Sequence, residues 1–390
     1  MYNYGLHLYL AMFAPKSQFD SFNVFQISIF ADMKRLIIAV NDDLNTDQRV
    51  LRIAGTLSQN GFDVFLFGRM SNNSKPLKIG HKAFRAKLLV NKGMMFYFLF
   101  NWRLFWFLMT HKFDAVLSND LDSLVGSSLA SILKHKPVIY DSHEYYTEVP
   151  ELVGRPFKRR IWLFAERLFL PRTKASYTVC QSIADIYYEK YHKHFDVVRN
   201  VPYSLPKPNV DNRRNVVMYQ GALNLGRGIE LMIDAMKYLS DCELVIAGSG
   251  DIDSDLRKRA SSLVEGGKIT FLGRLAPDEL HSKTLEAKVG LSLEEDLGLN
   301  YHYALPNKLF DYIQARVPVI VADLPEMRNI VQTYKVGQVL TDRTPQSLAN
   351  LIHNVMAESS VYYNNLDTAS MQLCWENESK NLLDIYQCLK

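Results

Sequence analysis

The chain has 390 residues, 48% of them hydrophobic and 22% charged, which excludes collagen-like, low-complexity and wholly disordered proteins. Its 45 basic and 41 acidic side chains give a net charge of +4, too small to indicate nucleic-acid binding. The charge is divided unevenly, with +9 in residues 1–200 (26 basic, 17 acidic) and −5 in residues 201–390 (19 basic, 24 acidic). At about 100–200 residues per domain, the length predicts two domains.

The N-terminal segment and the cysteines indicate the compartment. Residues 1–32 lack the basic start and apolar core of a signal peptide, so we interpret them as an upstream extension or an artefact of start-codon choice before Met33. No window reaches 18 uninterrupted apolar residues, so no spanning helix is expected. The four cysteines are widely scattered without a CxxC pair, which argues against disulfides or zinc and favours the reducing cytoplasm: Cys180, Cys242, Cys374 and Cys388.

Short apolar runs alternate with amphipathic helical patterns in the first half of the chain. This alternation is typical of β-α-β units in a parallel, doubly wound sheet. In chain order we expect strand 36–40, helix 48–60, strands 63–67 and 115–118, helix 123–133, strands 137–140 and 176–180, and helix 183–191.

Residues 93–109 form the most apolar stretch, interrupted by Asn101 and Arg103. Two interpretations remain open: a buried helix, or a helix that lies in a membrane interface with its aromatic side chains in the lipid. The basic cluster Arg155–Arg160 also allows two interpretations. It is either a solvated face, or a surface that contacts lipid headgroups or a lipid diphosphate.

The proline-rich segment 200–208 breaks the alternation and is interpreted as an interdomain linker. Beyond it we expect strand 215–219, helix 228–239, strand 243–246, helix 254–263, strand 269–272, helix 277–285, strand 289–293, helix 308–315, strand 318–321, helix 325–333 and strand 337–340. The sequence thus predicts two Rossmann-like α/β domains, 33–200 and 201–370, facing across a cleft. Ligands of such sheets bind at the carboxyl ends of the strands, which makes the cleft the expected active site.

Several common enzyme signatures are absent from the sequence. No glycine follows the first strand as G-x-G-x-x-G requires, and Gly248-Ser249-Gly250 lacks a third glycine. There is no P-loop, no H-E-x-x-H and no G-x-S-x-G. Simple hydride transfer, P-loop ATPase, zinc protease and α/β-hydrolase chemistry are therefore disfavoured.

Four segments of the second half stand in a characteristic order: Met218-Tyr219-Gln220-Gly221-Ala222-Leu223 with Gly226-Arg227-Gly228, residues 243–250, residues 269–273, and Leu305-Pro306-Asn307-Lys308-Leu309-Phe310-Asp311-Tyr312 before Pro318. Together they resemble the GT-B glycosyltransferases, specifically the retaining, nucleotide-sugar-dependent family 4 (group 1), over about residues 33–390. The resemblance implies a donor-binding domain at 201–370, an acceptor-side domain at 33–200, and a C-terminal helix within 371–390 that crosses back to the first domain.

The expected donor site must hold a diphosphate. Gly221 lets the backbone approach it, while Arg227 and Lys308 stabilise its negative charge as it leaves. Asp311, one turn beyond Lys308, can accept hydrogen bonds from ribose hydroxyls. The family usually has an arginine where Ala222 stands, which leaves more of the charge to Arg227 and Lys308. The alternatives are a solvated Arg227 and an ordinary helix-face pair of Lys308 with Asp311. The remaining expected donor positions are Gly248, Gly273 and Asn307.

The family also has two glutamates eight positions apart. Asp311 takes the place of the second, but Tyr303 stands where the first would be. Glu294 and Glu295 end the preceding strand and are the expected substitutes near the sugar, with Glu295 assigned to catalysis.

The segment Asp141-Ser142-His143-Glu144 follows a strand in the first half and resembles the family's acceptor-side histidine motif. The resemblance places His143 beside the reacting sugar and Glu144 on the acceptor side; burial or metal ligation of His143 is the alternative. Asn41, Asp47 and Arg49 follow the first strand and are further acceptor candidates.

The resulting hypothesis is a retaining, metal-independent glycosyltransferase without a cofactor. It would move a sugar from a UDP- or GDP-sugar to a saccharide or lipid-linked acceptor, in cell-surface polysaccharide synthesis. The expected place is the cytoplasm, with peripheral contact to the inner face of the cytoplasmic membrane through 93–109 and Arg155–Arg160. The alternatives are a GT-B nucleotide-sugar epimerase and a catalytically inactive GT-B subunit.

Overall fold

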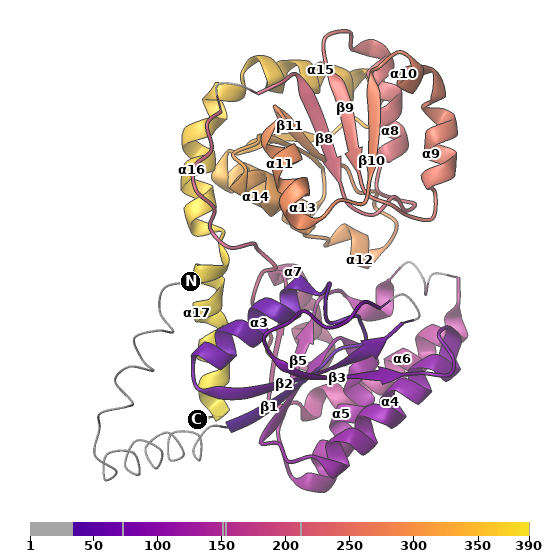
Figure 1. Cartoon of the computed structure of the whole chain (residues 1–390), viewed down its shortest axis with the longest axis vertical. Coiled ribbons are helices and arrows are strands. Elements are labelled where there is room, and N and C mark those ends of the chain that lie inside the picture. The colour runs from indigo at the N-terminus through magenta and orange to yellow at the C-terminus, as the bar shows by residue number, and fades with distance from the viewer. Residues whose placement is uncertain (1–33, 72–73, 150–151, 153, 211–212, 390) are drawn as a thin grey trace, which may run out of the picture.

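The computed structural model describes residues 34–71, 74–149, 152, 154–210 and 213–389, so the expected N-terminal extension 1–32 lies outside the described residues. The described chain forms two lobes, each with a parallel sheet flanked by helices (Figure 1). The expectation of two Rossmann-like units facing each other is confirmed.

The sheet of the first lobe has seven parallel strands in the order β3-β2-β1-β4-β5-β6-β7. The strands are β1 (Lys34–Ala39), β2 (Phe62–Met70), β3 (Lys82–Lys87), β4 (Ala115–Asn119), β5 (Val138–Ser142), β6 (Ala175–Thr178) and β7 (Asp196–Val197). The helices are α3 (Gln48–Gln59), α4 (Gly93–Thr110), α5 (Leu121–Lys134), α6 (Pro156–Phe169) and α7 (Gln181–Tyr191), with the 3-10 turns η1 (Tyr146–Glu148) and η3 (Leu170–Arg172).

The sheet of the second lobe has six parallel strands in the order β10-β9-β8-β11-β12-β13. The strands are β8 (Val216–Gln220), β9 (Glu243–Ala247), β10 (Ile269–Gly273), β11 (Val289–Ser292), β12 (Val319–Ala322) and β13 (Gly337–Leu340). The helices are α8 (Ile229–Ala235), α9 (Asp253–Arg259), α10 (Ser261–Glu265), α11 (Pro277–Leu285), α12 (Leu299–His302), α13 (Asn307–Gln314), α14 (Pro325–Tyr334) and α15 (Pro345–Ala357), with η4 (Met236–Tyr238) and η5 (Ser359–Tyr362).

The last helices connect the two lobes. Helix α16 (Tyr363–Gln372) packs against α13 and α14 of the second lobe, and α17 (Trp375–Tyr386), followed by η6 (Gln387–Leu389), packs against α3 and β7 of the first (Figure 1). Trp375 is 1% exposed, and its indole nitrogen donates to Thr56 Oγ1 at 2.9 Å. Leu382 and Tyr386 join the hydrophobic cluster that lies on Leu36 and Ile38 of β1. The C-terminal helix is therefore part of the core of the first lobe.

Helix α4 is apolar on two opposite faces. Phe96, Phe100 and Leu104 are buried against the first sheet, whereas Trp102 and Trp106 are about half exposed. The helix predicted at 93–109 is thus present, and burial accounts for only one of its faces. A helix that is apolar all round is normally buried all round, so the exposed aromatic face is unusual. Within the described residues, no helix is long and apolar enough to cross a membrane.

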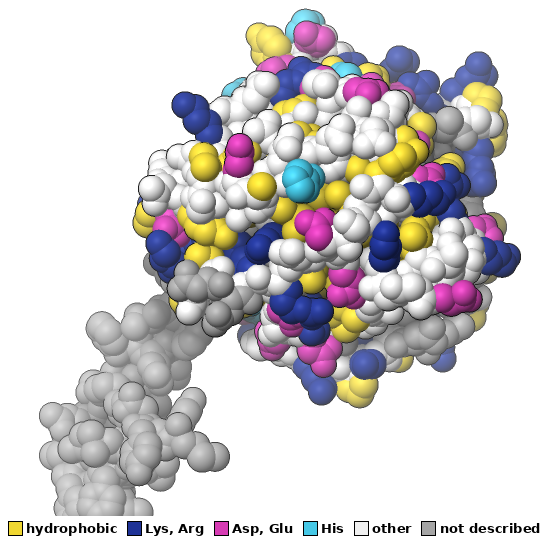
Figure 2. Space-filling view, turned by 90° about the horizontal axis from the view of Figure 1, so that it is seen from above, with side chains coloured by type: hydrophobic (Ala, Val, Ile, Leu, Met, Phe, Trp, Pro, Cys, Tyr) yellow, Lys and Arg dark blue, Asp and Glu magenta, His cyan; other side chains and the backbone are white. Residues whose placement is uncertain are grey.

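On one face of the second lobe, charged side chains are scattered and do not form a single patch (Figure 2). On the face seen from above in Figure 2, acidic and basic side chains are interspersed with hydrophobic ones. The surplus of negative charge in residues 201–390 therefore forms no single acidic patch on that face. The charges that would act on a bound ligand are therefore those of individual side chains in the cleft.

Candidate active site

A cleft of about 530 Å³ lies between the lobes, at the carboxyl ends of the strands. It is lined from the first lobe by the loop after β5, and from the second lobe by the loops after β8 and β11 and the start of α13. Seven of the expected site residues line it: His143, Glu144, Gly221, Arg227, Asn307, Lys308 and Asp311.

The donor side of the cleft is built around one buried carboxylate. Glu294, fully buried just after β11, pairs with Lys308 Nζ at 2.8 Å and with Arg227 Nη1 at 3.5 Å. Ser292 Oγ donates to its other oxygen at 2.8 Å. Burial would raise the pKa of Glu294, but the two cations and this hydrogen bond lower it. Two positive charges on one carboxylate leave a local excess of positive charge at the cleft wall. The pairing of Lys308 with Asp311, which the sequence left open, is not what the structure shows.

Aromatic rings hold both cations in place. Lys308 Nζ lies 4.2 Å from the centroid of the Tyr219 ring, and the Arg227 guanidinium lies 5.1 Å from that of Tyr301. Such contacts restrict two long, flexible side chains. The cations are therefore preorganised at the cleft rather than free in solvent.

Four expected donor-side residues lie behind the wall instead of lining it: the buried Glu294, and also Gly248, Gly273 and Glu295. A Cβ on Gly248 would come within 1.8 Å of the carbonyl oxygen of Gly221, and Gly248 N–H donates to the carbonyl of Gly273 at 2.8 Å. The missing side chain of Gly248 thus allows the loops after β8 and β9 to pack against each other. Glu295 is also outside the lining residues; it lies 3.9 Å from Arg343. Of the two candidate glutamates, Glu294 is the one that contacts the cations.

Asp311 lies on the cleft side of α13 and accepts a hydrogen bond from Gln220 Nε2 at 2.8 Å. Gln220 is fixed in turn by Thr284 Oγ1, which donates to its amide oxygen at 2.8 Å. Burial raises the pKa of Asp311 to about 6, although the Arg52 charge and the Gln220 hydrogen bond oppose the shift. The carboxyl group is suited to bind hydroxyl groups of a ligand.

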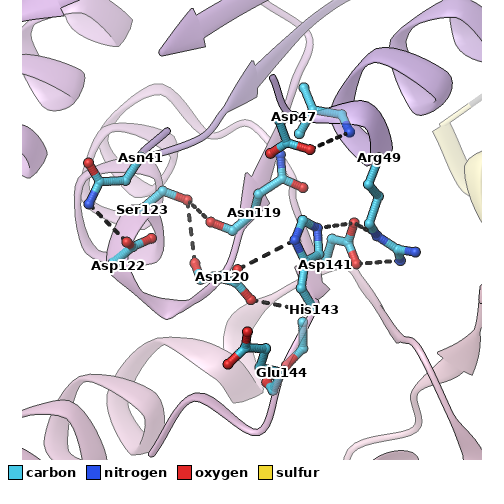
Figure 3. A network of polar contacts seen from close by, with 12 residues as sticks. Asn41, Asp47, Arg49, Asn119, Asp120, Asp122, Ser123, Asp141, His143 and Glu144 are labelled. Carbon is cyan, nitrogen blue, oxygen red and sulfur yellow. Dashed lines mark hydrogen bonds and ion pairs between the residues drawn. The ribbon is translucent and has the colours of Figure 1, made fainter. Parts of the chain in front are cut away.

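The acceptor side is centred on His143 (Figure 3). Its Nε2 lies 3.0 Å from Asp141, and its Nδ1 lies 3.5 Å from Asp120, which also accepts the His143 backbone N–H at 2.8 Å. Arg49 forms a two-pronged pair with Asp141, at 2.9 and 2.8 Å. The adjacent ends of β4 and β5 bring the two aspartates to either side of the ring, since Asn119 is in register with Asp141.

These charges shift the proton affinities of the network. Burial would lower the pKa of His143, but Asp141 and Asp120 raise it to about 9. Burial raises the pKa of Asp120 to about 7, against the pull of His143, whereas Arg49 and His143 overcome burial and hold that of Asp141 at about 2. At neutral pH the ring is therefore cationic, with Asp141 as its permanent counterion.

Asp120 has a strained backbone, with φ 56° and ψ 169°. Only glycine adopts this region readily, and other residues there cost about 1–3 kcal/mol. Asp120 stands directly before α5, but its side chain makes no capping hydrogen bond to that helix. The strain instead accompanies the contact with His143.

The first-strand candidates do not reach the cleft. Arg49 is 2% exposed and occupied by Asp141 and by the carbonyl of Val198, so it supports the site from behind rather than meeting an acceptor. Asp47 caps α3 by accepting the Val50 N–H. Asn41 donates to Asp122 at 2.9 Å. A strand-end position was a sound guide to the region, but the sequence does not show that these side chains already have partners.

A residue from the second lobe holds Glu144. Asn300 of α12 donates from Nδ2 to Glu144 Oε2 at 3.1 Å and accepts the backbone N–H of Tyr145 at 3.0 Å. It is 8% exposed. The amide side chain thus connects the lobes at the floor of the cleft. Sequence reasoning missed Asn300, and also Asp120, Asp141 and Gln220; the strand-end positions of the last three were the available signal.

Among the described residues, no group of His, Cys, Asp or Glu side chains could hold a metal ion. The polar atoms of the cleft are instead arranged as cations with one buried carboxylate on the donor side, and as a histidine between carboxylates on the acceptor side.

Comparison with known proteins now identifies the family. Residues 204–370 match the glycosyl transferases group 1, and residues 47–201 match the glycosyltransferase family 4. The chain is a glycosyltransferase of this type. A curated relative, an uncharacterized glycosyltransferase of Methanocaldococcus jannaschii, is 24% identical over 187 residues. That match spans 46% of this chain and 46% of the relative, so the chain matches about half the length of that protein.

Solved structures confirm the GT-B fold of the glycosyltransferase. Sucrose-phosphate synthase from Thermosynechococcus elongatus has a TM-score of 0.72 at 16% identity, covering 91% of this chain and 98% of that one. Anabaena HepE in complex with UDP-glucose has a TM-score of 0.71 at 13% identity, covering 91% and 99%. WaaG, a glycosyltransferase of lipopolysaccharide biosynthesis, has a TM-score of 0.68 at 14% identity, covering 90% and 99%.

Proposed function

We propose that this glycosyltransferase moves a sugar, with retention of anomeric configuration, from a UDP- or GDP-sugar to a saccharide or lipid-linked acceptor. The observation that carries the proposal is the pair of cations on Glu294 at the donor wall of the cleft. Lys308 and Arg227 provide the charge that a leaving diphosphate requires. The complex of Anabaena HepE with UDP-glucose supports a nucleotide-sugar donor.

The roles of the side chains follow from their positions. Lys308 and Arg227 stabilise the diphosphate, and Asp311 binds the ribose. The acceptor hydroxyl attacks the anomeric carbon from the side of the leaving group, so the bond to the phosphate oxygen breaks as the new glycosidic bond forms. The hydroxyl proton passes to the departing phosphate. Glu294 is not assigned as a nucleophile because Lys308, Arg227 and Ser292 already occupy it.

The test uses the full chain and a panel of UDP- and GDP-sugars. The correct donor should raise the melting temperature and, with an acceptor, give a product whose anomeric configuration NMR shows to be that of the donor. Inversion would reject the proposed mechanism. Interconversion of the donor without an acceptor would instead favour an epimerase, and failure to bind any nucleotide would favour an inactive subunit. Undiminished turnover in excess EDTA is expected because the proposed reaction needs neither metal nor cofactor.

The exposed aromatic face of α4 supports a second part of the proposal: peripheral contact with the cytoplasmic membrane, as expected for an enzyme of cell-surface polysaccharide synthesis. Trp102 and Trp106 are 50% and 49% exposed, and on α6 Phe157 and Phe164 are 73% and 68% exposed. Basic side chains of the Arg155–Arg160 segment lie next to Phe157 in the sequence and would attract anionic lipid.

Vesicle co-sedimentation tests this contact. The W102S/W106S variant should bind vesicles of phosphatidylglycerol and phosphatidylcholine less tightly than the wild type, because two large aromatic side chains no longer enter the lipid. Val361→Ser removes an exposed apolar side chain from the other lobe and serves as the control. Equal binding of all three proteins would reject membrane contact through α4.

A further inference from the structure

A second cavity, of about 430 Å³, lies in the first lobe between α4, η1 and α6. Glu144 lines both this cavity and the interlobe cleft, so the cavity and the cleft share this residue as a wall. Asp120 also lines the cavity and reaches His143 from it. A molecule that occupies the cavity would therefore have one end at the proposed reaction centre.

The body of the cavity is aromatic. Trp162, 5% exposed, makes edge contacts with Tyr97 and Tyr146, at centroid distances of 5.0 and 5.2 Å. Rings locked in this way form a rigid wall with little conformational entropy to lose when a ligand binds. A rigid aromatic wall next to carboxylates suits a sugar, which presents apolar C–H faces and hydroxyl edges.

The cavity wall from α6 is basic. Arg155 and Lys158 line it, and in the described part of the chain neither makes an ion pair. Their neighbour Arg159 behaves differently, because it pairs with Glu148 and donates to the carbonyl of Thr147. A neutral sugar would leave both free cations without a partner, whereas a phosphate would accept hydrogen bonds from both.

We propose that this cavity is the acceptor site and that it selects a saccharide carrying a phosphate group, with the sugar ring against Trp162 and the phosphate at Arg155 and Lys158. This inference rests on the proposed glycosyl transfer, and it specifies the class of acceptor. A sugar phosphate free in solution and a lipid-linked sugar share this chemistry. The proposal places the acceptor hydroxyl at Glu144, the residue that lines both the cavity and the cleft.

The experiment compares matched sugars on the full-length protein with saturating UDP. Isothermal titration measures glucose, galactose and N-acetylglucosamine 1-phosphates against the corresponding methyl glycosides. At least one phosphate should bind about tenfold more tightly than its methyl glycoside, since each lost charge-assisted contact costs roughly that factor. The R155A/K158A variant should lose this preference. Arg160→Ala removes an exposed cation of the same helix that does not line the cavity, and should keep it.

Titration of UDP in the same samples distinguishes a failure of the acceptor proposal from a failure of the transferase proposal. If UDP binds but phosphates and methyl glycosides bind equally, or no phosphate binds, the acceptor proposal is overturned while the transferase proposal stands. If the double variant keeps the preference and loses only binding to phosphatidylglycerol vesicles, the two cations serve the membrane surface and the proposal is again overturned. Tighter binding of a prenyl ester of the same sugar phosphate would support a lipid-linked source, and equal binding would support a soluble one.

Discussion

The two lobes have opposite net charges. At the cleft, however, each lobe presents charges whose sign is opposite to that of its own net charge. The second lobe belongs to the acidic half of the chain, but its wall places Lys308 and Arg227 on a single carboxylate. The first lobe belongs to the basic half, but it surrounds His143 with carboxylates. Net charge acts over the distance at which a ligand approaches, whereas buried charges a few ångströms from the ligand determine what it can do there. The sign of a lobe is thus a poor guide to the sign of its site.

The largest effect should come from Lys308. We expect K308A to lower kcat by about 10²–10³, as the loss of a preorganised charge at a leaving group does elsewhere. Because Lys308 is buried on Glu294, the variant should also lose stability, by at most about 3–5 kcal/mol, with Arg227 limiting the loss.

The double variant E294Q/K308A separates these two consequences. It removes the unpaired buried charge, so its melting temperature should recover while its turnover stays low. Lys258→Ala, an exposed lysine of α9, is the control. Recovery of turnover together with stability would remove Lys308 from the chemistry and make its role structural.

The His143 network should make the protein less stable as the pH rises. His143 has a pKa raised from 6.5 to about 9, so its contribution is complete below pH 6.5 and is lost as the pH rises through 9. Asp120, raised from 3.8 to about 7, changes stability in the same direction between pH 4 and 7. Chemical denaturation should show a loss of up to about 3 kcal/mol between pH 6.5 and 9. The variant D120N/H143Q should have a flatter profile, and an unchanged slope would contradict this account.

Asn300 tests whether the lobes must be connected at Glu144. Asn300→Ala removes one hydrogen bond to the Glu144 carboxylate and one from the Tyr145 backbone. We expect kcat/KM to fall about tenfold, since these two bonds are worth roughly 1 kcal/mol each at most in a partly wet cleft. The exposed Asn354→Ala on α15 is a matched control. An unchanged kcat/KM would show that the hydrogen bonds from Asn300 are not required to position Glu144.

The smallest effect concerns the strained backbone of Asp120. Asp120→Gly and Asp120→Ala both remove the carboxylate from His143, but only glycine relieves the φ of 56°. The glycine variant should be more stable than the alanine variant by about 1 kcal/mol, with turnover low in both. Thermal unfolding of the two proteins measures the difference. Equal stability would mean that the strain is relieved in solution.

The sequence predicted the fold better than the site because the two depend on different signals. Buried parallel strands such as β9 are nearly continuous apolar runs, and this pattern predicts them directly. Strand β3, Lys-Ala-Phe-Arg-Ala-Lys, was missed because a sheet edge carries charged side chains that resemble a loop. At the site, the choice between Glu294 and Glu295 depends on which one points inward at the end of β11. The burial of Arg49 depends on Asp141, 92 residues away. Neither can be inferred from local pattern.

The C-terminal helix has a consequence for how the chain folds as it is made. The face of the first sheet that carries Leu36 and Ile38 is covered in part by Leu382 and Tyr386, which the ribosome synthesises only after the whole second lobe. The first lobe therefore cannot complete its core when its own strands have left the ribosome. Part of its apolar surface stays uncovered until the second lobe and α17 have been synthesised. Chaperone dependence during translation, and insolubility of chains that stop before Trp375, are the expected biological costs of joining the lobes in this way.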